Sequence, residues 1–383
     1  MRFFHLSDLH IGLRLHNRDL YEDQRVIFGQ ISALAREYRP DAVVIAGDIY
    51  DKSVPSQDAV ALFDEFLTGL SEAAPDAEIM MISGNHDSGI RINTFRSILQ
   101  KQHIHMIGLP PQKEGEHIEK VVLRDEFGPV NFYLLPFVRP SMLRALLPER
   151  EDGAARSYDE SVRALLAREE IDPSERNVLV SHQFYLPDGA RAEDVERMAS
   201  EIVIVGNIDQ VSASCLEPFD YAALGHIHKP MKVGSERFRY SGTPLACSLS
   251  EAGQKKGVIL VELPEKGTLK TEVLPLYPKR AVREIRGLLL ELCAQPSEDY
   301  VRVVLTDKED LDVFEMQDRL RAAFPNLLEI RRDTAMAETR DFSYDPEEQR
   351  TPMELITAFL GDVDEEEEAL LRAVLQKVQE ESV

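Results

Sequence analysis

Five short polar motifs occur along the chain, and each directly follows a run of apolar residues. The motifs occupy residues 7–10, 47–51, 84–87, 181–182 and 225–228. The apolar runs before them have the length and composition of buried strands, and they cover residues 3–6, 42–46, 79–82, 177–180 and 221–224. Loops that follow the strands of an open α/β sheet gather along one edge, where ligands bind. We therefore expect all five motifs to meet in a single crevice.

The side chains of these motifs predict a site for two divalent metal ions. Apart from Asp51 and Asp87, they supply two carboxylates, one amide and five imidazoles, and two ions about 3.5–4 Å apart can clamp the attacking and leaving oxygens of a displacement at phosphorus. Asp48 is expected to bridge the ions. A mixed oxygen and imidazole set without thiolates favours manganese, leaves iron or zinc as alternatives and disfavours calcium. The predicted metal ligands are Asp8, His10, Asp48, Asn85, His182, His226 and His228.

His86 is the candidate catalytic residue. It lies beside a predicted ligand but is expected to point elsewhere, where it would protonate the leaving oxygen or stabilise charge on the phosphate. Asp87 either orients His86 or caps the helix that follows, and Asp51 is expected to be structural. His16 lies near the first motif and is a candidate substrate contact. The remaining histidines are interpreted as core, strand or surface residues, namely His5, His103, His105 and His117.

The order of strands and helices predicts an α/β fold with four segments. Parallel βαβ units open residues 1–275, a small α+β unit follows at 279–333, and a polar linker covers 334–350. Residues 351–383 predict two short amphipathic helices, which can pack on their own chain or dock onto a partner. Earlier helices are expected at 18–38, 57–72 and 91–101, with a helical cover at 141–171.

Composition sets limits on partners and location. The net charge of −24 disfavours tight DNA binding by surface charge alone, and residues 341–383 carry a net −10. Residues 229–256 carry a net +4, which keeps phosphate binding near the site feasible. No apolar stretch reaches the roughly 18 residues of a membrane helix, and the first motif leaves no room for a signal peptide. Three widely separated cysteines suit a reducing cytoplasm.

In these motifs the chain resembles the calcineurin-like metallophosphoesterase superfamily, and within it the SbcD-type nuclease subunits of bacterial SbcCD complexes. The narrower resemblance rests on Gly12 with the segment 15–24, the turn at 240–245, a small capping domain and the terminal helices. It implies a two-sheet α/β sandwich in which the seven ligands and His86 keep their predicted roles. The capping domain would engage DNA, and the terminal helices would bind the coiled-coil base of an SbcC-type ABC ATPase.

The resemblance also implies an activity: a manganese-dependent 3′→5′ exonuclease on duplex DNA, and an endonuclease on single strands and hairpins. The enzyme would act in DNA repair, recombination and replication as a homodimer within a heterotetramer, in the cytoplasm. Residues 47–51 lack the Asp-Arg-Gly continuation of serine/threonine phosphatases, and Asp51 stands where purple acid phosphatases have a tyrosine ligand. The alternatives are a phosphodiesterase acting on small phosphodiesters and a non-catalytic scaffold.

Overall fold

The computed structural model describes residues 1–147, 154–190, 209–307, 312–333 and 371–372. The chain divides into two compact units, Met1–Arg332 and Asp333–Val383. All the elements below belong to the first unit. Apart from residues 371–372, the helical pair predicted for residues 351–383 lies outside the described residues. Within the described part of the chain, no helix is long and apolar enough to cross a membrane.

The first of two six-stranded sheets carries three of the five motifs. Its strand order is β16-β15-β1-β4-β5-β6, in which β1, β4, β5 and β6 run parallel and β15 and β16 pair antiparallel at the other side. The bounds are β1 (Arg2–Leu6), β4 (Ala42–Ala46), β5 (Glu78–Ile82), β6 (Ile104–Ile107), β15 (Gly257–Glu262) and β16 (Lys270–Pro275).

The second sheet carries the other two motifs, after β9 and β12. Its order is β13-β14-β12-β9-β8-β7, with parallel pairs from β14 through β8 and antiparallel pairs at both edges. The bounds are β7 (Glu119–Asp125), β8 (Gly128–Leu135), β9 (Arg176–Ser181), β12 (Tyr221–Leu224), β13 (Met231–Val233) and β14 (Ser235–Tyr240).

The two sheets pack face to face around a mainly aliphatic core that contains a few aromatic rings. The Phe3 ring meets the rings of Phe132 and Tyr221 edge-on, with centroids 5.3 and 5.8 Å apart. His5 is fully buried there, with Nδ1 3.0 Å from the Tyr221 hydroxyl and Nε2 3.2 Å from the Leu224 carbonyl oxygen. The expectation that His5 belongs to the core is confirmed, and the predicted α/β architecture of two sheets is present.

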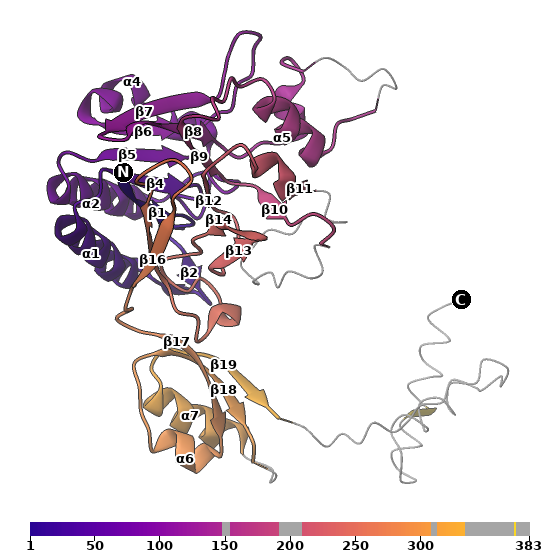
Figure 1. Ribbon diagram of the computed structural model, residues 1–383. Coiled ribbons are helices and arrows are strands. Elements are labelled where there is room, and N and C mark those ends of the chain that lie inside the picture. Colours follow the sequence, from indigo (N-terminus) through magenta and orange to yellow (C-terminus); the bar gives the residue numbers. More distant parts are fainter. Residues whose placement is uncertain (148–153, 191–208, 308–311, 334–370, 373–383) are drawn as a thin grey trace. The chain divides into compact units, whose positions relative to one another are not determined.

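Helices cover the outer face of each sheet (Figure 1). Helices α1 (Tyr21–Tyr38) and α2 (Gln57–Ala73) pack their apolar sides on the first sheet, and α5 (Tyr158–Leu166) packs on the second. A short hairpin of β2 (Arg14–Leu15) and β3 (Arg18–Asp19) precedes α1. Helix α1 therefore begins three residues later than the sequence predicts.

The helix predicted at 91–101 is wrong. The segment instead contains α3 (Gly89–Ile92), α4 (Arg96–Leu99) and the 3₁₀ helix η1 (Gln100–Gln102). Phe95 has φ 62°, a left-handed conformation that a continuous right-handed helix excludes. The spacing of apolar residues therefore does not reveal that the backbone of a single residue, Phe95, interrupts the helix.

The helical cover predicted at 141–171 is only partly present. A 3₁₀ helix, η2 (Pro140–Leu143), begins the segment, and α5 follows with a capping box between Ser157 and Glu160. Residues 148–153 lie outside the described residues. A further parallel pair, β10 (Phe184–Leu186) with β11 (Gln210–Ser212), was not expected from the sequence.

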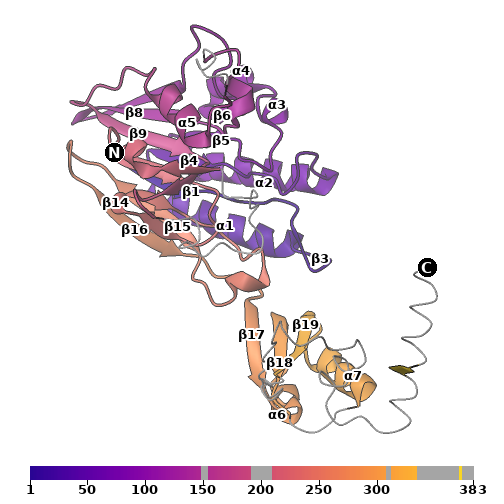
Figure 2. The same ribbon diagram turned by 90° about the vertical axis from the view of Figure 1, so that its right-hand side faces the viewer.

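The small α+β unit has its own apolar core. Its sheet is entirely parallel, in the order β17-β18-β19, and α6 and α7 lie beside it (Figure 2). The bounds are β17 (Val282–Gly287), α6 (Leu289–Cys293), β18 (Tyr300–Leu305), α7 (Val313–Ala323) and β19 (Leu327–Arg332).

A buried ion pair joins this small unit to α1. The carboxylate of Asp23, which is fully buried, accepts hydrogen bonds from Nε and Nη2 of Arg280 at 3.0 and 2.6 Å. It also accepts one from the Tyr300 hydroxyl at 2.9 Å, and the Arg280 guanidinium lies over the Tyr300 ring. Because the carboxylate has no access to water, its charge depends on these partners.

Candidate metal centre

All five motif loops meet at one end of the sandwich, although they come from two facing sheets and not from one open sheet. The loops after β1 and β4 pair through the Asp8 amide and the Gly47 carbonyl, 2.9 Å apart. The second sheet joins them where the His226 amide donates to the Asp8 carboxylate at 3.0 Å. His182 also crosses, since its Nδ1 lies 2.7 Å from the Ala46 carbonyl oxygen. The five motifs therefore meet in one place, as expected, but they do so because two sheets pack together.

Asp8, His10 and His228 form one buried group of potential ligand atoms. The side chains come from the first and last motifs, and all three residues are almost inaccessible to water. Nε2 of His10 lies 3.1 Å from Nε2 of His228. The two imidazoles therefore face each other with a carboxylate beside them.

A second group is built around Asn85. Its Oδ1 lies 3.0 Å from Nε2 of His182 and 2.9 Å from Nδ1 of His226. Asp48 lies between the two groups, because its Oδ2 is 3.3 Å from Nε2 of His182 and 3.7 Å from Nε2 of His10. The structure thus brings all seven predicted ligands together, with Asp48 in the place that a shared ligand needs.

The backbone at the predicted ligands is strained. Asp8, His10, Asp48 and His226 all have positive φ, at 53°, 44°, 50° and 103°. Each such non-glycine residue costs on the order of 1–3 kcal/mol and is typical of functional sites. The backbone of Gly84 also lies very close to the Asp48 side chain, because a Cβ on Gly84 would be 2.1 Å from the Asp48 Oδ1. Packing and tight turns therefore hold these side chains in place.

The residues present fit a pair of divalent cations. Because Ala46 contributes a carbonyl, Nδ1 of His182 must donate to it, which leaves the neutral ring's Nε2 lone pair facing the group. Nδ1 of His10 is buried and has no hydrogen-bond partner among the described residues. Burial and then the neighbouring His228 lower the pKa of His10 well below its ordinary value. Burial opposes the charged form of His182, but the carboxylates of Asp48 and Asp8 outweigh it and raise the pKa to about 9, so a cation would bind Nε2 in place of the second ring proton.

His86 lies closer to the ligands than expected. Its backbone amide donates to Oδ1 of Asp48 at 2.9 Å, and its Nδ1 donates to the Asp51 carbonyl oxygen at 2.8 Å. The half-buried ring stands edge-on to the His10 ring, with centroids 4.8 Å apart. The expectation that His86 points away from the group is therefore wrong, because the Asp51 carbonyl holds the ring at its rim.

Asp87 has neither of the two roles weighed from the sequence. Its carboxylate accepts hydrogen bonds from the backbone amides of Ile49, Tyr50 and Gly84, at 3.0, 2.9 and 2.9 Å. It thus fastens the loop after β4 to the loop after β5. Burial, and then the negative charge of Asp48, raise the pKa of Asp87 to about 6.

Two residues that support the site were not found from the sequence. Gln24, buried on α1, donates to the carbonyl oxygens of His10 and Leu9 at 2.8 and 3.2 Å and so holds the first ligand loop. Phe137 stacks on the His226 ring, with centroids 6.4 Å apart and planes 19° apart, and the Arg139 guanidinium lies over the Phe137 ring, 5.5 Å from its centroid. A glutamine within the apolar face of a helix is the one signal that could have marked Gln24.

The positive segment 229–256 is less available than its composition indicates. Lys232 pairs with Glu236, and Arg237 pairs with Glu217. Lys256 is buried and pairs with Glu251 at 2.7 Å. Glu236 and Glu251 are already subtracted in the net +4, so of these three pairs only the one between Arg237 and Glu217 lowers it further, and phosphate binding near the site stays a prediction.

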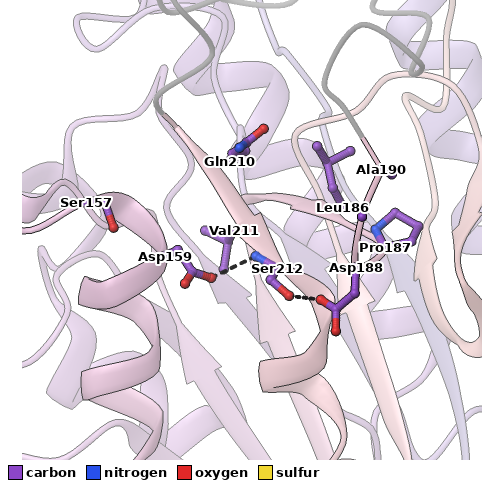
Figure 3. A pocket seen from close by; sticks show the side chains of 10 residues that line it. Ser157, Asp159, Leu186, Pro187, Asp188, Ala190, Gln210, Val211 and Ser212 are labelled. Atoms are coloured by element: carbon purple, nitrogen blue, oxygen red, sulfur yellow. Dashed lines mark hydrogen bonds between the residues drawn. The ribbon is translucent and has the colours of Figure 1, made fainter.

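A hollow of about 510 Å³ lies elsewhere, beside α5 and the β10–β11 pair (Figure 3). Oδ1 of Asp159 accepts from the Ser212 amide at 2.8 Å, and Asp188 accepts from the Ser212 hydroxyl. None of the residues that line it is a predicted metal ligand. We assign no chemistry to this hollow.

Comparison with protein families decides the class of the fold. The model of the calcineurin-like phosphoesterases matches residues 1–230. The chain belongs to this family. The phosphoesterase also matches, over residues 278–363, a model described as the Type 5 capsule protein repressor C-terminal domain (SbcD_C).

Individual relatives agree with this family. The phosphoesterase is 28% identical over 337 residues to the D subunit of the SbcCD nuclease of Staphylococcus epidermidis, covering 86% of this chain and 85% of that protein. A dimetal phosphatase from Danio rerio aligns with 13% identity and a TM-score of 0.42, over 73% of this chain and 99% of that one. TT1561 of Thermus thermophilus aligns with 14% identity and a TM-score of 0.40, over 71% and 98%.

Proposed function

We propose that this phosphoesterase is the nuclease subunit of an SbcCD-type complex and hydrolyses DNA phosphodiester bonds with two divalent metal ions. The observation that carries the proposal is the pair of ligand groups on either side of Asp48. The similarity to an SbcCD nuclease subunit over most of both chains supports DNA as the substrate. Manganese suits the mixed oxygen and imidazole donors.

The roles of the ligands follow from their positions. Asp8, His10 and His228 would hold one ion, and Asn85, His182 and His226 the other, with Asp48 shared between them. When bound, the two ions supply a polarised phosphate and a nucleophilic water. This division uses every predicted ligand once and Asp48 twice.

His86 is assigned the proton transfer. With Nδ1 donating to the Asp51 carbonyl oxygen, the neutral ring has its second nitrogen available for the reaction. In the protonated form Nε2–H can donate to the leaving oxygen, and this type of catalysis typically contributes about 10²–10⁴-fold in rate. The Asp51 contact fixes the ring's orientation while this happens.

Further parts of the proposal concern polarity, partners and location. We assign 3′→5′ exonuclease action on duplex ends, endonuclease action on single strands and hairpins, and assembly with an SbcC-type ABC ATPase in the cytoplasm. A homodimer is supported by the exposed apolar side chains of Ile90, Phe95 and Ile98, which are 75%, 71% and 64% accessible. Side chains of this kind gathered on one short segment are typical of a contact surface.

The decisive experiment compares DNA with a small substrate. Metal-stripped protein is given manganese, magnesium or zinc, with and without the ATPase partner, and is assayed on linear duplex DNA and on bis-(p-nitrophenyl) phosphate. We expect manganese-dependent cleavage of both substrates. Hydrolysis of the small diester without any DNA cleavage in either condition would overturn the nuclease assignment.

His86→Ala tests the catalytic role within the same assay. We expect the rate to fall about 10²–10⁴-fold, while manganese binding by isothermal titration calorimetry stays within a few fold. His103→Ala is the matched control, because His103 is an exposed histidine paired with Glu78. Loss of rate and metal binding together in His86→Ala would contradict the acid role.

A further inference from the structure

A buried polar cluster lies directly behind the ligand His228, on the side away from the ligand group. Its centre is Glu251, in the 3₁₀ helix η6 (Leu249–Glu251), with a side chain that is fully buried. Oε1 of Glu251 lies 3.4 Å from Nδ1 of His228. The other nitrogen of the same ring, Nε2, is the one that faces His10. The imidazole therefore stands between a carboxylate and the ligand group.

The contacts of Glu251 fix its charge and orientation. Oε2 accepts from the Thr243 hydroxyl at 2.9 Å and from the Lys256 ammonium at 2.7 Å, and Oε1 accepts from the Ser248 hydroxyl at 3.2 Å. Because these three groups donate hydrogen bonds to it, the Glu251 carboxylate is stabilised in its ionised form. The His228 nitrogen beside it is then satisfied as N–H, which places the ring's lone pair on Nε2.

Lys256 ties the cluster to the backbone as well. Its ammonium donates to the His228 carbonyl oxygen at 3.0 Å and to Gln254 at 2.9 Å, in addition to Glu251. The Thr243 amide also donates to the His228 carbonyl oxygen, at 3.2 Å. Main chain and side chain of His228 are thus held by the same few residues. This gives a role to the turn at 240–245, which the sequence singles out without explaining.

We propose that Glu251 is a positioning residue for the metal centre: it fixes the tautomer and orientation of His228 for the ion that this histidine shares with Asp8 and His10. The proposal rests on the two-metal function above. A rival arrangement exists, because Cys247, Glu251 and His228 could themselves surround a cation. The Lys256 ammonium already occupies the Glu251 carboxylate, which disfavours a second cation there.

Manganese binding to the metal-stripped, full-length protein tests this without relying on catalysis. Mn²⁺ is titrated and followed by calorimetry and by the electron paramagnetic resonance of free Mn²⁺. The wild type should bind two ions. Glu251→Gln should weaken one site about 10–100-fold, the range for loss of a carboxylate behind a ligating histidine, and change the other less than threefold. Glu236→Gln, an exposed carboxylate paired with Lys232, should change neither.

A double variant separates positioning from folding. Glu251→Leu combined with Lys256→Met removes the buried charge pair together, and such apolar replacements are often neutral or stabilising. We expect near wild-type thermal unfolding and the same selective weakening of one site. Recovery of two tight sites in this variant, or equal weakening of both sites in Glu251→Gln, would overturn the positioning role. A third ion bound by the wild type would do so too. A wild type that binds no ion pair would instead refute the proposed function itself.

Discussion

His5 should make the folded protein lose stability in mild acid. Its Nε2 faces the Leu224 carbonyl, which can only accept, so Nε2 carries the hydrogen and Nδ1 accepts from the Tyr221 hydroxyl. Both sites of the neutral ring are satisfied, and a second ring proton would face no acceptor. Burial accordingly lowers the pKa of His5 from 6.5 to about 3.

The direction of this pH effect follows from the protonation of His5 in the folded and unfolded states. Between pH 6.5 and pH 3 the unfolded chain binds a proton that the folded protein excludes, so stability is fully present above pH 6.5 and is lost as the pH falls. Each pH unit below 6.5 removes about 1.4 kcal/mol. At pH 4.5, His5 should therefore account for a loss of about 3 kcal/mol from the free energy of unfolding.

Urea unfolding of the metal-stripped protein at pH 7.5 and pH 4.5 measures this loss. The wild type should lose about 3 kcal/mol more than His5→Gln, since all other titrating groups cancel in the comparison. His16→Asn, at an exposed position with φ 45° that asparagine tolerates, should behave as the wild type. Equal losses in wild type and His5→Gln would refute the reasoning, as would an NMR signal of the His5 ring that titrates near pH 6.5.

Three further outcomes are expected. Arg280→Met should lower the free energy of unfolding in urea by about 3 kcal/mol, because it leaves the buried Asp23 carboxylate without its ion-pair partner. Gly84→Ala should weaken manganese binding at least about tenfold in calorimetry, because its methyl group would overlap the carboxylate of the shared aspartate, whereas Gly29→Ala, with open space around it, should not. Deleting residues 351–383 should abolish co-purification with an SbcC-type ATPase and spare hydrolysis of a small phosphodiester; a truncated protein that still co-purifies contradicts this.

The sequence predicts those elements whose signal is local. Strands β4 and β12 begin and end at the predicted residues, because each is a continuous apolar run that ends at a glycine. The sequence also predicts that the seven candidate ligands lie close together, since each lies in a loop that follows such a strand. The break at Phe95 does not, because a single left-handed residue leaves no mark on apolar periodicity.

The residues that hold the candidate ligands in place are harder to predict from the sequence than the candidate ligands themselves. Gln24, Phe137 and Glu251 act through contacts with motif residues from other parts of the chain. Which sheet each strand joins also depends on pairing between distant segments, and no local pattern carries that information. The basic segment 229–256 shows the same limit at one residue, because Arg237 pairs with Glu217, a carboxylate outside the segment.

Asp23 and Gln24 are consecutive residues in the first turn of α1, and they serve different parts of the chain. Asp23 holds Arg280 and Tyr300 of the small α+β unit, while Gln24 holds the carbonyl of His10. The residue that binds the small α+β unit, Asp23, is therefore directly followed in the chain by the residue that holds the His10 loop, Gln24. A movement of the small unit against α1 would therefore act one residue away from the contact that holds the His10 loop.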